Sequence, residues 1–218
     1  MNTEECWYKG VCTNTCSESC LRLLEMSYLV DNSGIPKAKQ KPISLIATDE
    51  DYEAFTYLAQ VKDNIVEWVK QARDIYITSK YTGNGKTSWA IKLLLKYFDS
   101  IWAGNGFRVR GLFVHVPTLL LQLKDFSNPV SADFKQNLIN ADLVVWDDIA
   151  STELSNYDYS QLLMYIDQRV MNEHMNIYTG NLDSKQAIEK ALGQKLASRI
   201  WENSDIFKFG SPDKRGEN

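Results

Sequence analysis

One short glycine-rich loop constrains this chain more than any other feature. It lies between residues 74–79, which we predict to be a strand, and a predicted helix from residue 86 to about residue 98. Glycines let the backbone turn its N–H groups toward phosphate oxygens, and the helix adds its positive N-terminal end. We therefore expect nucleotide phosphates to bind at Thr82, Gly83, Asn84, Gly85, Lys86, Thr87 and Ser88.

Two residues of this loop carry the chemistry. Lys86 would reach the β- and γ-phosphates, and the Thr87 hydroxyl would bind Mg²⁺. The usual pattern has a further glycine five residues before Gly85, where this chain has Lys80. The alternative interpretation is a strand–helix turn that binds no ligand.

Polar residues follow two further predicted strands. Asp147 and Asp148 end the apolar run LVVWDD, and paired acids at the end of a buried strand indicate a function at that edge of the sheet. Asp147 would hold Mg²⁺, and Asp148 would orient or deprotonate the attacking water. Asn181, after the run NIYTG, could position that water; a simple turn is the alternative.

Helix and strand signals alternate along the chain, which predicts an α/β fold with a parallel sheet covered by helices on both faces. The first helix is expected to have Leu21, Leu24, Tyr28 and Leu29 as its apolar stripe. The expected helices span about 20–31, 48–72, 86–98, from 117 onward, 159–173 and 184–202, and the expected strands span 74–79, 108–116, 143–146, 176–179 and 206–209.

Composition narrows the class of protein. The 218 residues are 44% hydrophobic, enough for one domain with a sizeable core and a small appendage. The net charge of −4 excludes a chain-wide basic surface, although a local basic groove is compatible with it. No apolar run approaches the roughly 18 residues of a membrane span, and residues 1–8 lack an apolar signal core. We expect a cytoplasmic protein without disulfides.

Four cysteines mark a separate N-terminal segment. Cys6, Cys12, Cys16 and Cys20 all lie within the first 20 residues. We therefore divide the chain into a Cys-rich module (1–33), a linker (34–47) and a main domain (48–218). Four thiolates suit zinc or a 4Fe–4S cluster, and free thiols are the third possibility. A straight helix would separate Cys12 from Cys20 by about 12 Å, so one zinc ion requires the chain to bend.

The motifs in their order resemble the AAA+ ATPases, and more specifically the DnaC/DnaI-like helicase loaders, which are relatives of the DnaA initiator. The resemblance covers about residues 34–215 and depends on GIP at 34–36, the GNGKT loop, VVWDDI and YTGN. It implies a three-layer AAA+ fold and makes Asn181 the sensor-1 residue. It also implies that Arg199 is an arginine finger acting on ATP held by a neighbouring subunit. Only eight residues follow Gly210, so we expect no full C-terminal lid.

The resemblance also implies a function. Such a protein would be an ATP-controlled adaptor that binds a DnaB-type replicative helicase and delivers it onto single-stranded DNA. It would self-assemble, grip the helicase through the Cys-rich module, and reside in the host cytoplasm if phage-encoded. Two alternatives remain: a transposition ATPase of the IstB type, and an adaptor or inhibitor of helicase loading that binds ATP without hydrolysing it.

A few other residues have simpler interpretations. We expect His115 and His174 to be structural, and Tyr8, with Trp7, to be available for a partner contact. The basic run of Lys37, Lys39 and Lys41 is typical of a solvated linker, and contact with DNA or a partner is the alternative.

Overall fold

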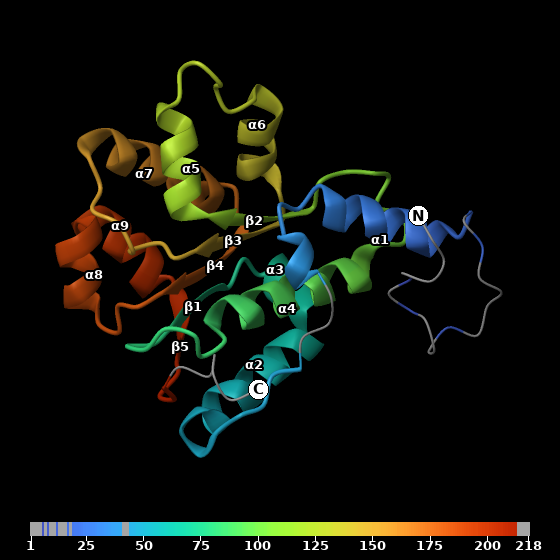
Figure 1. The fold of residues 1–218 in the computed structure, drawn as a ribbon, viewed down its shortest axis with the longest axis horizontal. Helices are drawn as coiled ribbons and strands as arrows, with labels where there is room; N and C mark the ends of the chain where they lie inside the picture. Colours follow the sequence, from blue (N-terminus) through green and yellow to red (C-terminus); the bar gives the residue numbers. More distant parts are fainter. Residues whose placement is uncertain are drawn as a thin grey trace.

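The computed structural model describes residues 6, 8, 12, 17, 19–40 and 44–212. Across these residues five parallel strands form one central sheet in the order β2-β3-β4-β1-β5 (Figure 1). The predicted α/β fold with a parallel sheet is thereby confirmed. The strands are β1 (Asp74–Thr78), β2 (Gly111–His115), β3 (Leu143–Asp147), β4 (Met175–Gly180) and β5 (Ser204–Lys208).

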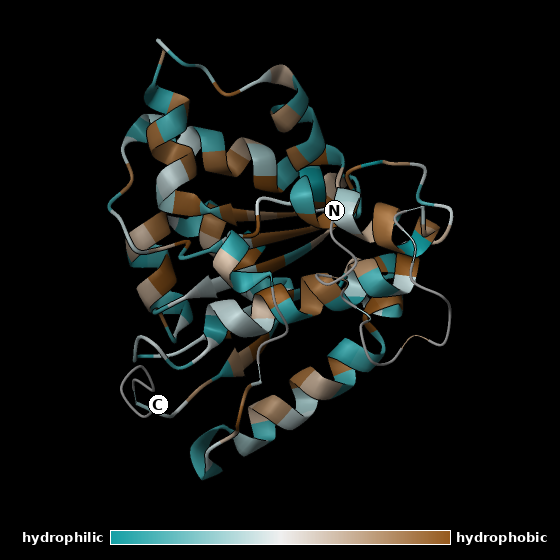
Figure 2. Cartoon of the chain, turned by 45° about the vertical axis from the view of Figure 1, so that its right-hand side comes forward, coloured by the Kyte–Doolittle hydropathy of each residue, from teal (hydrophilic) through white to brown (hydrophobic). Residues whose placement is uncertain are grey.

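Successive side chains of the central strands face opposite layers, as the pleat requires. In β3, Leu143 and Val145 belong to one hydrophobic core, whereas Val144 and Trp146 belong to the other. Every residue of β1, β3 and β4 is buried, which is the pattern of a parallel sheet covered on both faces. Figure 2 shows apolar residues concentrated in these strands.

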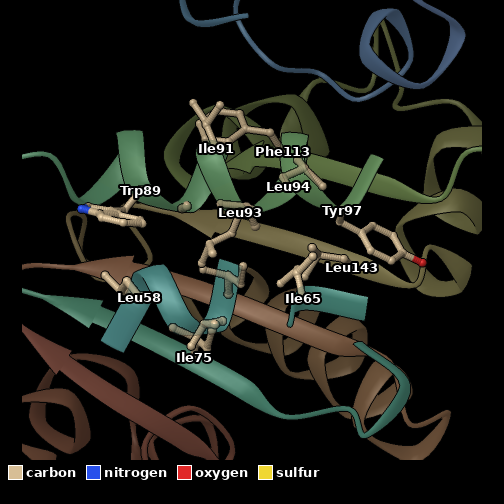
Figure 3. Close-up of a cluster of buried hydrophobic side chains, with 14 of the residues drawn as sticks. Leu58, Ile65, Ile75, Trp89, Ile91, Leu93, Leu94, Tyr97, Phe113 and Leu143 are labelled. Atoms are coloured by element: carbon tan, nitrogen blue, oxygen red, sulfur yellow. The ribbon is translucent and has the colours of Figure 1, made fainter. Parts of the chain in front are cut away.

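Helices cover both faces of the sheet. The first core lies between the sheet and the helices α1 to α4, and Figure 3 shows part of it. The second lies under α5 to α9. The bounds are α1 (Leu21–Asp31), α2 (Tyr52–Asp63), α3 (Ile65–Lys70), α4 (Lys86–Ile101), α5 (Val116–Lys124), α6 (Ala132–Asn140), α7 (Asn156–Met171), α8 (Lys185–Leu192) and α9 (Gln194–Ala197), with short turns η2 (Lys37–Lys39), η3 (Asp49–Asp51) and η4 (Ser198–Glu202).

Helix α1 packs against α4 and shares the first core. Its expected apolar stripe was wrong in part, because Leu21 and Leu24 are 57% and 43% exposed, whereas Leu23 and Met26 are buried. The helix has apolar residues on most sides, so periodicity alone did not orient it. The division of the chain at residue 33 stays a prediction, to which the structure adds that α1 is part of the main core.

Two other elements differ from expectation. The helix predicted over 48–72 is divided at Asn64, whose side-chain amide donates to the carbonyl of Gln60 (2.9 Å) and ends α2. Helix α6 was not predicted; Ser131 caps it by accepting from the amide of Phe134 (3.1 Å). No helix in the described ranges combines the length and the apolarity that crossing a bilayer requires.

Candidate nucleotide-binding site

One cleft of about 860 Å³ gathers most of the predicted site residues. The loop follows β1, the acids end β3 and Asn181 follows β4, and the carboxyl ends of parallel strands meet at one edge of a sheet. The predicted residues that line the cleft are Thr82, Gly83, Asn84, Gly85, Lys86, Thr87, Ser88, Asp147, Asp148 and Asn181.

The glycines of the loop adopt the conformation that the motif requires. Gly83 and Gly85 have φ of 69° and 98°, in the left-handed region, and Gly85 directly precedes α4. Lys80 stands where the usual pattern has another glycine. Its φ is not positive, and its exposed ammonium lies 3.5 Å from a carboxylate oxygen of Asp183. A side chain is therefore accommodated at this position without entering the cleft.

Asn84 anchors the loop from beneath. Its side chain is buried, and its amide donates to the hydroxyl of Ser79 (2.6 Å) and the carbonyl of Ser211 (3.2 Å). Its amide oxygen accepts from Lys86 (3.3 Å). The buried carboxylate of Asp51 in turn accepts from the backbone and hydroxyl of Ser211. These hydrogen bonds form a clasp that joins the loop to segment 210–211 and to the turn before α2. No local sequence pattern indicated this clasp, because its partners are far apart along the chain.

The two predicted magnesium ligands lie side by side. The Thr87 hydroxyl donates to Asp147 Oδ1 (2.7 Å), which also accepts from the Thr179 hydroxyl (2.8 Å). Burial raises the pKa of Asp147, and these two hydrogen bonds oppose that rise. A hydroxyl beside a carboxylate at a helix N-terminus is the oxygen donor set that Mg²⁺ with a nucleotide phosphate prefers, so the residues fit this ion.

Asp148 is held in an unusual backbone conformation. Its φ is 57°, and its amide donates to the Thr179 hydroxyl (3.1 Å). The carboxylate lies 3.7 Å from His115 Nε2 at the end of β2. Non-glycine residues in this region cluster at functional sites. His115 was expected to be structural, yet it lines the cleft; its position at the end of a strand was the only available signal.

The turn after β4 positions Asn181. The Tyr76 and Thr78 side chains both donate to the carbonyl of Leu182, at 2.9 and 2.8 Å. Gly180 leaves room for this contact, because a Cβ there would lie 2.6 Å from the Tyr76 hydroxyl. Asn181 is thereby directed to the cleft from a fixed turn.

An apolar wall closes the other side of the cleft. Leu45, Ile46 and Phe55 line it, next to the glycine-rich loop. Phe55 packs edge-on against Trp89 of α4, with ring centroids 5.2 Å apart. Such a surface suits the flat face of a nucleobase beside a phosphate-binding loop.

Arg199 lies outside this cleft. It is in the π-helical turn η4, half exposed, and its Nε donates to Asp167 Oδ1 of α7 (2.6 Å). It does not line the cleft of its own chain.

The cysteine site lies partly outside the described residues, because Cys16 is not among them. Of the described cysteines, Cys6, Cys12 and Cys20 form no disulfide. Trp7 is also outside these residues. Tyr8, expected to be available to a partner, is half-buried instead: its hydroxyl donates to Asp99 of α4 (2.7 Å), and the Arg22 guanidinium lies 3.4 Å from its ring centroid.

The fold and the site together define a class. A five-stranded parallel sheet in this order, with the glycine-rich loop after β1, paired acids after β3 and a polar residue after β4, is an α/β fold with its candidate site at the carboxyl ends of the strands. The solved structures of similar fold include a helicase loader and a replication initiator. The DnaC helicase loader superposes with a TM-score of 0.66 at 19% identity, covering 80% of this chain and 100% of that one.

Two further structures agree. DnaI gives a TM-score of 0.65 at 15% identity, over 82% of this chain and 96% of that one. The replication initiator DnaA, bound to AMPPCP and single-stranded DNA, gives 0.57 at 15% identity. Here the match covers 78% of this chain and 49% of DnaA. No family model and no curated protein matches the sequence. At these identities the shared property is the fold, and it confirms the predicted resemblance at that level.

Proposed function

We propose that this protein is an ATP-dependent helicase loader, which binds a DnaB-type replicative helicase and helps deliver it onto single-stranded DNA. The observation that carries the proposal is the hydrogen bond from Thr87 to Asp147 (2.7 Å) in a cleft that Lys86 and Asn181 also line. The fold shared with DnaC and DnaI over about four fifths of the chain supports the loader role.

Each cleft residue has a role in this proposal. The loop amides and Lys86 bind the triphosphate, and Thr87 with Asp147 holds the magnesium ion, which neutralises developing charge on the phosphates. Asp148 orients the attacking water and accepts its proton, and Asn181 fixes that water near the terminal phosphate. In the structure Lys86 donates to the Tyr81 carbonyl (2.7 Å) and to Asn84, so nucleotide binding exchanges these contacts for phosphate oxygens.

The site is completed by a second subunit in this proposal. Arg199 stands outside its own cleft, on the exposed turn η4, where it can face the cleft of a neighbour. A fixed guanidinium suits the charge spread over a transferring phosphoryl group. ATP would therefore control self-assembly as well as hydrolysis.

The N-terminal cysteines are assigned to helicase binding. Cys6, Cys12, Cys16 and Cys20 would hold zinc or a 4Fe–4S cluster that shapes this segment. Metal and sulfide analysis of anaerobically purified protein decides between the two. A folded protein free of metal would reject the site in favour of free thiols.

The proposed function is tested by capture on the cognate replicative helicase, followed by transfer of that helicase onto single-stranded DNA. We expect the wild type to pass both steps with MgATP. Lys86→Ala should lose nucleotide affinity by more than about tenfold and fail in transfer, because a charge-assisted contact to phosphate is removed. Lys96→Ala, on the same helix and paired with Asp99 (3.4 Å), should behave as the wild type.

The outcomes separate the alternatives. ATP hydrolysis without helicase capture would reject the loader role and favour a transposition ATPase. Helicase capture with equal ATPase rates for the wild type and Lys86→Ala would favour an adaptor that does not hydrolyse ATP.

A further inference from the structure

The linker contributes a lysine to the nucleotide cleft. Lys39, in the turn η2, lines the cleft together with His115, Asp147 and Asp148, and it is partly buried. Lys37, in the same turn, is exposed and does not line the cleft. The interpretation of this basic run as a solvated linker therefore agrees with the exposure of Lys37 and not with the position of Lys39, and Lys41 lies outside the described residues.

The linker is fixed to the outer edge of the sheet. The Ser33 carbonyl accepts from the amide of Phe113 in the edge strand β2 (2.6 Å), and the Ser33 hydroxyl donates to the Val30 carbonyl (2.7 Å). Ile35 is buried in the first core. At Gly34, φ is 76°, and a Cβ would lie 2.8 Å from the Phe113 carbonyl oxygen. These contacts fix the course of residues 33–35, and the following turn η2 therefore lies near the carboxyl end of β2.

The cleft contains both acidic and basic side chains, and their positions indicate what Lys39 could bind. Asp147 and Asp148 place two carboxylates at the end of β3. Lys39 lines the same cleft as these two carboxylates and brings a positive charge to it. Lys86 enters from the start of α4, after β1, and two strands separate β1 from β2 in the sheet. The two lysines therefore reach the cleft from different sides, Lys86 at the loop and Lys39 at the carboxylates.

We propose that Lys39 binds the terminal phosphate of a nucleoside triphosphate in the cleft of its own subunit and so distinguishes ATP from ADP. This assignment rests on the proposed function, since it requires a nucleotide in the cleft. The loop amides contact the phosphates that both nucleotides share, and Lys86 reaches the β- and γ-phosphates from the side of the loop. Lys39 lines the cleft with the acids that would hold magnesium and orient the attacking water, and the attacked terminal phosphate would lie next to them.

The test compares Lys39→Gln with Lys37→Gln, which removes the same charge from the same turn. Affinities for MgATP and MgADP are measured by isothermal titration calorimetry on the full chain. We expect Lys39→Gln to weaken MgATP binding about tenfold and MgADP binding less than about twofold, as loss of one charge-assisted contact implies. Lys37→Gln should match the wild type, and Lys39→Arg should retain most of the preference for ATP.

Each outcome has a definite meaning. If the ratio of ATP affinity to ADP affinity is the same in the wild type and in both glutamine variants, the role of Lys39 is overturned. The proposed function would stand in that case. Equal loss of single-stranded DNA binding in both variants, with that ratio unchanged, would overturn the role of Lys39 in favour of DNA contact. A wild type that binds neither nucleotide would overturn the proposed function and this assignment together.

Discussion

At the scale of single residues, the glycine-rich loop depends on one buried side chain that makes its hydrogen bonds within the protein. Asn84 is buried. Its side-chain NH₂ donates to Ser79 and Ser211, and its side-chain oxygen accepts from Lys86. Truncating it would leave these buried partners without their hydrogen bonds, and an unsatisfied buried group costs more than a lost contact at the surface.

We expect Asn84→Ala to lower the free energy of unfolding by about 1–3 kcal/mol and to weaken nucleotide binding. The measurements are urea denaturation and calorimetric titration with MgATP. Asn181→Ala is the matched control for stability, because it removes the same group from an exposed position on the same cleft. Equal unfolding free energies for the wild type and Asn84→Ala would show that the clasp does not stabilise the fold.

At the scale of elements, η4 presents Arg199 on a turn that is joined to α7. The ion pair with Asp167 holds the guanidinium at the surface of the second layer, and a π-helical turn of this kind often accompanies a functional position. The cleft and this turn are therefore separate surfaces of one chain, which a head-to-tail assembly could bring together.

Subunit mixing tests this arrangement. Arg199→Ala should bind ATP with nearly unchanged affinity and hydrolyse it at least about tenfold more slowly, because the lost charge acts in the transition state. Lys86→Ala lacks a working cleft but keeps Arg199, so mixing the two inactive variants should restore part of the steady-state ATPase rate. Undiminished turnover by Arg199→Ala alone would refute the assignment of the finger.

The strands and the site residues that follow them could be predicted from the sequence, but two other cleft residues could not. The strands were recognisable as short apolar runs, and parallel topology then brings the loop, Asp147 and Asn181 to one edge. Lys39 and His115 were not predicted as cleft residues. Their positions depend on where β2 lies in the sheet and on the long-range bond between Ser33 and Phe113, and neither leaves a mark in local periodicity.

At the scale of the whole molecule, a buried polar network joins several elements. Asp74 of β1 accepts from the backbone amide of Asn176 in β4 (2.6 Å). Arg169 of α7 is fully buried and donates to Asn176 (2.7 Å) and to the carbonyls of Ala141 (2.7 Å) and Met175 (2.6 Å). Breaking such a network exposes several unsatisfied groups at once, so it favours cooperative unfolding.

This network predicts a dependence of stability on pH. Burial raises the pKa of Asp74 from 3.8 to about 7, although Asn176 and Arg169 lower it. The folded state therefore keeps a proton that the unfolded chain releases, and the free energy of unfolding should fall as pH rises from about 4 to about 7. In urea denaturation between pH 5 and pH 8, Asp74→Asn should remove this part of the slope. An unchanged slope would exclude Asp74 as its source.

The contact between Phe55 and Trp89 has a practical consequence. Phe55 lines the cleft, whereas Trp89 of α4 is buried behind it. An indole changes its emission when its neighbours move, so displacement of the apolar wall would be seen in the fluorescence of Trp89. The chain has six tryptophans, so the signal of Trp89 is the difference in emission between the wild type and Trp89→Phe.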